Sequence, residues 1–432
     1  MRKKSFVLLL SFVLLLSGFL SGCGNNEEAS AGTTEDGKTV VDFWTFWGSE
    51  TRRPMIEKII KDFNESQDEI VVKHTYLPWG DIWTKNLASI AAGDPADVII
   101  NDINSVAQRA ENNQAEDLSE YLGEDFKDRF YPHLWETVEY EGKPYAVPFN
   151  TDTRLLYYNK DAFKEAGLDP EKPPKTWDEL EEYAKKLDKK NGDQYERVGF
   201  YPLWGSVGSD AWMVSADNGR NFIEDGEVLI NTPRKVEALE WVKEWKDRIG
   251  EDTVQTFEAE FQNQQANPFI SGKIAMWVNV GNNYTQIKEF KPDMNFGVAP
   301  IPAYDKDSKH WSSGGGFVAE IPKGSDNPEA AAEFIKYLTG KEAQKYWAMQ
   351  NFDNVANIEG AEAAAAELEG KDQEVYQATI DNLETTLLAP TPVNYPDYQN
   401  LMNPKIDQFM MGQMEAEEAL EEAQKAVEKM KR

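Results

Sequence analysis

The stretch LASIAAGDPADVII, residues 87–100, carries the chain from a helix into a strand. A helix that begins near Asp81 is expected to end here, because Gly93, Asp94 and Pro95 are residues that stop helices. Ala96–Ile100 follows as a short apolar run of the kind that forms a buried strand. The stretch therefore predicts one helix-to-strand unit of an α/β fold.

The residues before this stretch repeat the same alternation. Strands are predicted over 40–44 and 70–72, and a helix over 53–64, where apolar residues recur at helical spacing. The order strand, helix, strand, helix, strand is typical of a parallel sheet with right-handed crossovers. Further strands are predicted at 145–148, 155–158, 273–280, 296–300 and 317–321. Further helices are predicted at 161–166, 177–189, 233–247, 328–338 and 415–429.

The first residues have the layout of a secretory signal peptide. Three basic residues, Arg2, Lys3 and Lys4, precede an apolar run over 6–16, and small residues follow. Leu20 to Cys23 resembles the lipobox of bacterial lipoproteins, in which the signal is cut before a cysteine that receives lipid. We therefore predict a signal peptide at 1–22, lipidation of Cys23 and a flexible tether at 23–38.

The composition limits the kinds of partner. The chain has 45 Lys+Arg against 76 Asp+Glu, a net charge of −31. Nucleic acid is not expected as a partner, since its binding needs concentrated basic residues. The acidic surface also repels an anionic bilayer, so attachment is expected through lipid. The 13 tryptophans favour aromatic plates in a binding site, and the single cysteine excludes an internal disulfide.

Signatures of an enzyme are mostly absent. The only histidines, His74, His133 and His310, lack metal-ligand spacing, and no nucleophile elbow or phosphate-binding loop occurs. We predict no cofactor, no metal and no catalysis. A glycosidase that needs only two carboxylates is the enzyme class that the sequence leaves open.

Seven stretches in order carry a resemblance to the extracellular solute-binding proteins of sugar ABC importers, the family of maltose-binding protein. They are residues 87–98, 140–148, 157–161, 174–180, 269–276, 297–302 and 314–317. The resemblance implies an α/β fold of the two-lobe, class II periplasmic-binding-protein type, with a hinge and a ligand cleft between the lobes. It places the first lobe at 39–150 and 303–340, and the second at 151–300 and 341–432.

The resemblance also implies a function outside the cytoplasm. A monomer anchored to the cell membrane would capture a mono- or oligosaccharide and deliver it to an ABC permease that a cytoplasmic ATPase drives. Two alternatives stay open: a binding protein for another polar solute such as glycerol phosphate, which needs a basic cleft, and a secreted carbohydrate-active enzyme.

The family's layout points to ligand-binding candidates on the first lobe and its crossing. Trp47 follows the first strand at the edge where α/β sheets bind ligands, with Trp44 either a plate or part of the core. Asp102 follows a strand and is either an acceptor for sugar hydroxyls or a helix N-cap. Asn150, Asp152 and Arg154 lie on the first crossing, where Arg154 alternatively braces the hinge.

Other candidates follow from the second lobe. Trp204 and Trp212 are possible plates, one of them expected to be packing. The family often has a "G-x-W" stretch at this point, but Gly281-Asn282-Asn283 lacks the tryptophan. Trp277 or Tyr284 is the expected substitute for that plate. Asn282 is a further ligand-binding candidate. Gly315 and Gly316 allow backbone N–H groups near a ligand. Tyr395 is a late aromatic candidate, and Trp177 is predicted to be core.

Overall fold

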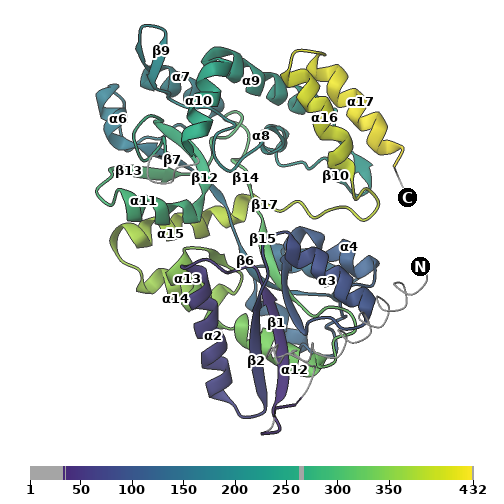
Figure 1. Cartoon of the computed structure of the whole chain (residues 1–432). Coiled ribbons are helices and arrows are strands. Elements are labelled where there is room, and N and C mark those ends of the chain that lie inside the picture. Colours follow the sequence, from purple (N-terminus) through teal and green to yellow (C-terminus); the bar gives the residue numbers. More distant parts are fainter. Residues whose placement is uncertain (1–32, 35, 262–266, 431–432) are drawn as a thin grey trace, which may run out of the picture.

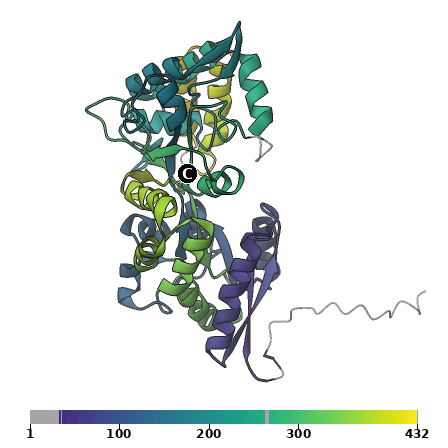
Figure 2. The same ribbon diagram turned by 90° about the vertical axis from the view of Figure 1, so that its left-hand side faces the viewer.

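The computed structural model describes residues 33–34, 36–261 and 267–430. The predicted signal peptide, Cys23 and most of the predicted tether lie outside the described residues. Within them, no helix is both long enough and apolar enough to cross a membrane. The chain folds into two lobes, one above the other in Figures 1 and 2, joined by segments that pass between them.

The first lobe is built on a six-stranded mixed sheet in the order β16-β6-β15-β3-β1-β2. β1 pairs in parallel with β2 and β3, as predicted, while β15 runs antiparallel to both β3 and β6. Its strands are β1 Thr39–Thr45, β2 Ile70–Tyr76, β3 Val98–Asp102, β6 Val147–Thr151, β15 Gly316–Glu320 and β16 Asn354–Val355.

Helices cover this sheet. They are α2 Arg52–Ser66, α3 Asp81–Ala92, α4 Val106–Glu111, α5 Pro132–Trp135, α12 Pro328–Leu338, α13 Lys341–Asn351 and α14 Ile358–Glu367. Helix α3 has the predicted bounds because Gly93 adopts the left-handed conformation, with φ 77°, and its N–H caps the carbonyls of Ser89 and Ile90. Residues 87–100 therefore form the predicted helix-to-strand unit.

The second lobe has a three-stranded sheet in the order β12-β7-β13, in which both pairings are antiparallel. Its strands are β7 Arg154–Asn159, β12 Met276–Val280 and β13 Phe296–Ala299. Its helices are α6 Lys160–Glu165, α7 Trp177–Leu187, α8 Ser209–Ala216, α9 Pro233–Ile249, α10 Glu251–Phe261, α11 Tyr284–Phe290, α15 Gly370–Asn382, α16 Tyr398–Met410 and α17 Ala416–Glu428. The parallel layout that the sequence predicts thus holds for β1, β2 and β3 but not for this sheet.

Short elements complete the fold. The two-residue strands β14 Ser312–Ser313 and β17 Thr386–Leu387 pair in parallel where the chain passes between the lobes. The remaining small elements are β4 Glu139–Tyr140, β5 Lys143–Pro144, β8 Lys189–Asn191, β9 Gln194–Arg197, β10 Ile223–Glu224, β11 Glu227–Val228, η1 Ile103–Ser105, η2 Glu124–Arg129, η3 Glu136–Val138, η5 Gly281–Asn283 and η6 Leu383–Thr385.

Two of the predicted lobe boundaries are wrong. Residues 303–311 stay with the second lobe, because Ala303 bridges Thr176 and Arg234 pairs with Asp305. The chain returns to the first lobe only at β14 and β15. Residues 341–367 belong to the first lobe, since β16 pairs with β6 and α13 packs on α2. The first crossing, between β6 and β7, lies within a few residues of the predicted position.

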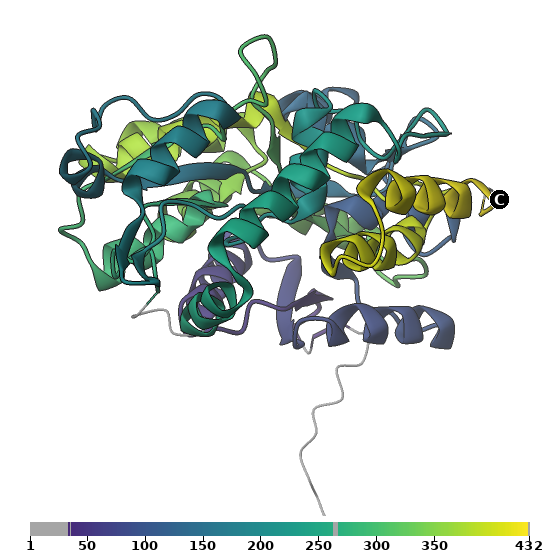
Figure 3. The ribbon, with the colours of Figure 1, turned by 90° about the horizontal axis from the view of Figure 1, so that it is seen from above.

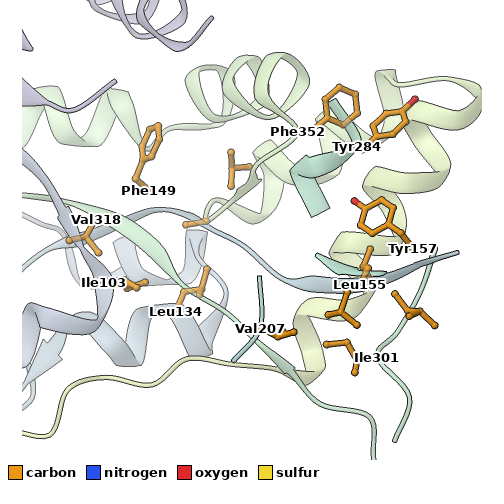
Figure 4. Packing of buried hydrophobic residues seen from close by; sticks show 14 of the residues in the cluster. Ile103, Leu134, Phe149, Leu155, Tyr157, Val207, Tyr284, Ile301, Val318 and Phe352 are labelled. Carbon is orange, nitrogen blue, oxygen red and sulfur yellow. The ribbon is translucent and has the colours of Figure 1, made fainter. Parts of the chain in front are cut away.

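The apolar core runs without a break through both lobes. Phe149 and Val318 of the first sheet belong to the same buried cluster as Leu155 and Tyr157 of the second. Figure 4 shows these side chains on either side of the crossing between β6 and β7. This continuous packing at the crossing fixes the position of the two lobes relative to each other.

Candidate ligand-binding cleft

A cavity of about 930 Å³ lies between the two lobes. Thr51, Arg52, Gln350 and Asn351 line it from the first lobe, at the start of α2 and the end of α13. The other lining residues come from the second lobe, and they include α10, which crosses above α2 in Figure 3. Its size is within the range of pockets that enclose small organic ligands.

Two tryptophans form the aromatic part of the second-lobe wall. Trp204 stacks on Phe257 with the rings 4° from parallel, and Trp277 stacks between Phe261 and Phe269. Both line the cavity, and both are at least 96% buried, since their exposed fractions are 2% and 4%. Little of either ring is exposed, and their role as plates for a ligand stays a prediction.

A glycine brings the polar part of the same wall close to β12. Gly205 has φ +107°, and a Cβ there would lie 1.9 Å from the carbonyl oxygen of Val278. Only glycine allows this approach. It places Ser206 beside Asn279, whose Oδ1 accepts a hydrogen bond from the Ser206 hydroxyl, and both residues line the cavity.

Amides and carboxylates complete the lining. Asn282 and Asn283 of η5 line the cavity, and the Asn283 Nδ2 has no hydrogen-bond partner among the described residues. Burial raises the pKa of the Glu258 carboxyl, and the neighbouring charge of Glu251 raises it further. The side-chain amides of Asn282 and Asn283 can both donate and accept hydrogen bonds, which suits ligands that carry many hydroxyl groups.

A second cavity, of about 220 Å³, adjoins the first at Ser206. Arg154, α8, β14 and Tyr398 line it. Arg154 bonds to the Asp152 carboxylate, to the Ser313 carbonyl at 2.9 Å and to the Ser206 carbonyl at 3.1 Å. These contacts correspond to the alternative in which Arg154 braces the hinge.

The first lobe carries an aromatic cluster that the sequence did not predict. Trp79 is 60% exposed and packs edge-on against Phe46, Trp83 and Phe317, with ring centroids 4.7, 4.7 and 5.7 Å apart. Phe46 follows β1 and Trp79 follows β2, while Phe317 lies near the start of antiparallel β15. All therefore lie at the sheet edge from which β6 leads into the second lobe.

The rule that parallel strands bind ligands at their carboxyl ends would have found this cluster. Trp47 follows the first strand and Asp102 the third, and Trp79 is the corresponding aromatic residue after the second. The exposed ring of Trp79 is the feature that a sugar face could stack on.

Two of the tryptophans predicted as plates are buried in the apolar core. Trp47 is 2% exposed and packs between Phe149 and Trp347, with ring centroids 5.0 and 4.4 Å away. Trp212 is 1% exposed, and its indole N–H donates to the Pro202 carbonyl at 2.8 Å. Neither ring has a free face for a ligand. Trp44 is half-buried instead, with its indole bonded to Asp42, and Trp177 is core, as predicted.

Asp102 is the N-cap of η1, one of its two predicted roles. Its Oδ1 accepts the Asn104 N–H at 2.8 Å at the start of η1. Burial raises the pKa of its carboxyl, the Asn104 N–H lowers it, and the charge of Asp152 raises it. It faces Phe317 across the β3–β15 pairing, so it lies beside the aromatic cluster.

The other candidates on the crossings serve the hinge. Gly315 donates its N–H to Asp152 Oδ1 at 2.8 Å, so this N–H is not free for a ligand. A Cβ on Gly316 would lie 2.3 Å from the Asn150 carbonyl oxygen, which explains that glycine by packing. Tyr395 is 2% exposed and donates to the Gly226 carbonyl at 3.3 Å. In the structure Gly315, Gly316 and Tyr395 make contacts within the chain, and their contact with a ligand stays a prediction.

Tyr284, the alternative substitute for the missing tryptophan, is buried. Its exposed fraction is 4%, and its hydroxyl donates to Asp372 at 2.5 Å. Asn150 is also buried and bonds Asp353, while Asn282 lines the cavity and bonds Asp353 from the other lobe. Of the predicted ligand residues, Trp204, Trp277 and Asn282 share the larger cavity, and Arg154 lines the smaller one.

Two lobes with a polar and aromatic cleft between them define a ligand-binding protein. The chain matches the profile of the family described as bacterial extracellular solute-binding protein over residues 47–345. It belongs to this family.

Relatives agree with this membership. A binding protein of Brucella abortus is 30% identical over 254 residues, 58% of this chain and 60% of that protein, so the match spans less than two thirds of its length. The arabinooligosaccharide-binding protein of Bacillus subtilis is 25% identical over 81% of this chain and 80% of its own. The sn-glycerol-3-phosphate-binding periplasmic protein of Rhizobium meliloti is 28% identical over 85% and 88%.

A solved structure shows the same fold. The structure of CpMnBP1 with mannotriose bound superposes with a TM-score of 0.77 at 25% identity, covering 90% of this chain and 99% of that one. The two-lobe fold predicted from the sequence is therefore confirmed.

Proposed function

We propose that the chain is the carbohydrate-binding component of an ABC importer and captures a sugar or oligosaccharide in the cleft between its lobes. The observation that carries this proposal is the lining of the cleft. Amides and hydroxyls of both lobes surround the larger cavity, and the aromatic cluster around the exposed Trp79 lies at the carboxyl ends of the first-lobe strands. Hydroxyls at the edge of a sugar ring suit amides, and its C–H faces suit aromatic rings.

The relatives support the same reading without deciding the ligand. One is named for arabinooligosaccharides and another for glycerol 3-phosphate, while a structural neighbour holds mannotriose. A phosphate ligand needs an unpaired cation. Among the described residues, each of the two cavities is lined by a single cation, Arg52 in the larger and Arg154 in the smaller. Both are already paired with an aspartate. A neutral sugar is therefore the ligand class we favour.

Transport requires partners and a location outside the cytoplasm. We infer that the closed, loaded protein docks on membrane permease subunits driven by an ATPase. The sequence from Arg2 to Cys23 supports export and lipid anchoring, which keep the protein near its permease. The relatives are binding proteins, which supports a role without catalysis.

Thermal-shift screening tests the proposal. A ligand that binds only the folded chain raises the melting temperature. The screen should include mannotriose, arabinooligosaccharides, maltooligosaccharides and sn-glycerol 3-phosphate. We expect a rise with at least one neutral sugar, and a rise with the phosphate alone would transfer the assignment to the second class of relatives.

A further inference from the structure

One buried carboxylate, that of Asp353, receives hydrogen bonds from four side chains on four segments of the chain. Arg52 Nη2 and Asn282 Nδ2 donate to its Oδ1 over 3.0 and 2.7 Å. Trp347 Nε1 and Asn150 Nδ2 donate to its Oδ2 over 2.9 and 3.1 Å. Three of the donors belong to the first lobe, and Asn282 belongs to the second. The carboxylate therefore connects the two walls of the cleft.

The backbone places Asp353 in this position. It follows α13 directly after Phe352, which adopts the left-handed conformation with φ 55°. The Phe352 ring packs edge-on against Tyr284 of α11 at 5.2 Å, and Figure 4 shows the two rings side by side. Asp353 is 4% exposed, so its charge is held between the lobes with little access to water.

Arg52 is the only cation among the described residues that line the larger cavity. It is the first residue of α2, whose first turn contains no acidic residue. The start of a helix and an arginine together favour an anion, because the helix dipole is positive there. Asp353 supplies that anion from within the chain, and its side chain is far more buried than that of Arg52, at 4% against 29% exposed.

The other charges of the cavity add to this effect. Glu258 and Glu289 also line it, so a phosphate entering the cleft would meet two carboxylates and an arginine already paired. A neutral polyhydroxy ligand meets no such repulsion and can use the remaining donors of Arg52.

We propose that Asp353 sets the charge selectivity of the cleft: by neutralising and positioning Arg52, it makes the cleft accept neutral sugars and reject phosphorylated ligands. This inference rests on the proposed function and names the substrate class of the same site. Asp353 acts through Arg52, so it is a positioning residue and not itself a ligand contact.

Calorimetric titration with inorganic phosphate and sn-glycerol 3-phosphate tests the proposal. We expect no detectable binding to the unaltered protein and detectable binding to Asp353→Asn, about ten-fold or more above the detection limit and weakening as salt is added. An asparagine keeps one acceptor oxygen for Arg52. Asn150 can turn its Oδ1, which has no partner among the described residues, toward the new amide.

The double variant Asp353→Asn/Arg52→Gln is the matched control. It removes the freed cation, so the gained phosphate affinity should disappear. A merely structural role of Asp353 would change stability alike in both variants without producing this gain and loss. Phosphate binding that persists in the double variant would contradict the proposal.

Gln350→Lys keeps the test open if Asp353→Asn does not fold. Gln350 is exposed and lines the same wall, and the substitution adds one positive charge without touching a buried donor. It should gain phosphate binding with the same salt dependence. Absence of a gain in every folded variant, or phosphate binding by the unaltered protein, overturns the inference. Failure of the proposed function looks different, since then no neutral sugar binds the unaltered protein.

Discussion

Thr153 and Thr386 share a hydrogen bond of 2.6 Å between their hydroxyl oxygens, although 233 residues separate them in the sequence. Thr153 lies on the first crossing between the lobes and Thr386 on the last. Ser312, on the middle crossing, accepts a hydrogen bond from the Thr153 hydroxyl at 3.2 Å, and the Asn382 amide donates to that same Thr153 hydroxyl at 2.6 Å. The segments that join the lobes are therefore tied to one another by a buried polar network.

Loss of the hinge hydroxyl should destabilise the protein. Thr153→Val keeps the shape of the side chain but removes one of the two acceptors of the Asn382 amide, the other being the Arg154 carbonyl. A buried donor without a partner costs about 1–3 kcal/mol, so the free energy of unfolding should fall by about that amount. Urea unfolding measures it, with Thr153→Ser as the control that keeps the hydroxyl. A valine variant as stable as the serine one would show that the network contributes little.

Removal of the exposed ring of the aromatic cluster should weaken sugar binding. Trp79→Ala takes away the one strongly exposed face, and stacking of this kind justifies an expected loss of about ten-fold in affinity. Because Trp79 is 60% exposed, stability should change little. Leu87→Ala, also exposed and also on the first lobe in α3, is the control and should bind as before. Equal affinities in the two variants would remove the cluster from the site.

Truncation of Trp47, unlike that of Trp79, should lower the stability of the protein. Trp47→Ala leaves a cavity between Phe149 and Trp347, and such truncations cost about 3–5 kcal/mol. The loss should be seen as a lower midpoint in urea unfolding, with Trp47→Phe as the milder control. A stable alanine variant with weak sugar binding would restore the role that the sequence analysis gave to this residue.

The raised pKa of the Asp102 carboxyl predicts a dependence of stability on pH. Its folded-state pKa lies above the ordinary 3.8, mainly because of burial. Below 3.8 the carboxyl is protonated in both states and makes no difference. As pH rises above 3.8 the unfolded chain ionises first, so the folded state loses stability until the pH passes the raised pKa.

Asp102→Asn removes this penalty and keeps an oxygen for the Asn104 N–H. The variant should therefore melt at a higher temperature than the unaltered protein near neutral pH, with the difference shrinking as the pH falls toward about 4. Melting curves across pH measure this. If the difference stays the same at every pH, the carboxylate is not the cause. A simultaneous loss of sugar affinity would support Asp102 as an acceptor for ligand hydroxyls.

Substitution of Cys23 tests the predicted attachment of the protein to the membrane through lipid. Cys23→Ser removes the thiol that a lipobox needs, so the protein should move from the membrane fraction to the medium or periplasm. Fractionation of cells followed by immunoblotting measures this. Continued membrane attachment of the serine variant would contradict the lipid anchor.

Local signals in the sequence predict the elements well where the stop signals are strong. Gly93 ends α3 where expected, and Thr176 caps α7 by accepting the Glu179 N–H. The antiparallel order of β12, β7 and β13 was not predicted, because strand pairing depends on residues far apart in the chain. The lobe boundary at 340 failed for the same reason, since β16 is too short to be recognised without its partner β6.

The site was harder to predict than the fold. Trp47 and Trp79 both follow a strand at the same sheet edge, yet one is 2% and the other 60% exposed. Tertiary packing decides this difference, since Phe149 and Trp347 come from distant segments. Asp353 carries no local signal at all, because its importance comes from four donors that only the folded chain brings together.

The most direct test of the central claim is a calorimetric titration of the purified protein with neutral oligosaccharides, followed by chromatography of the recovered sugar. The structure predicts saturable binding of one ligand in the cleft, with the sugar recovered intact. Heat without any shortened or altered product is the expected result. Cleavage of the sugar, or no binding by any neutral oligosaccharide, would contradict the account.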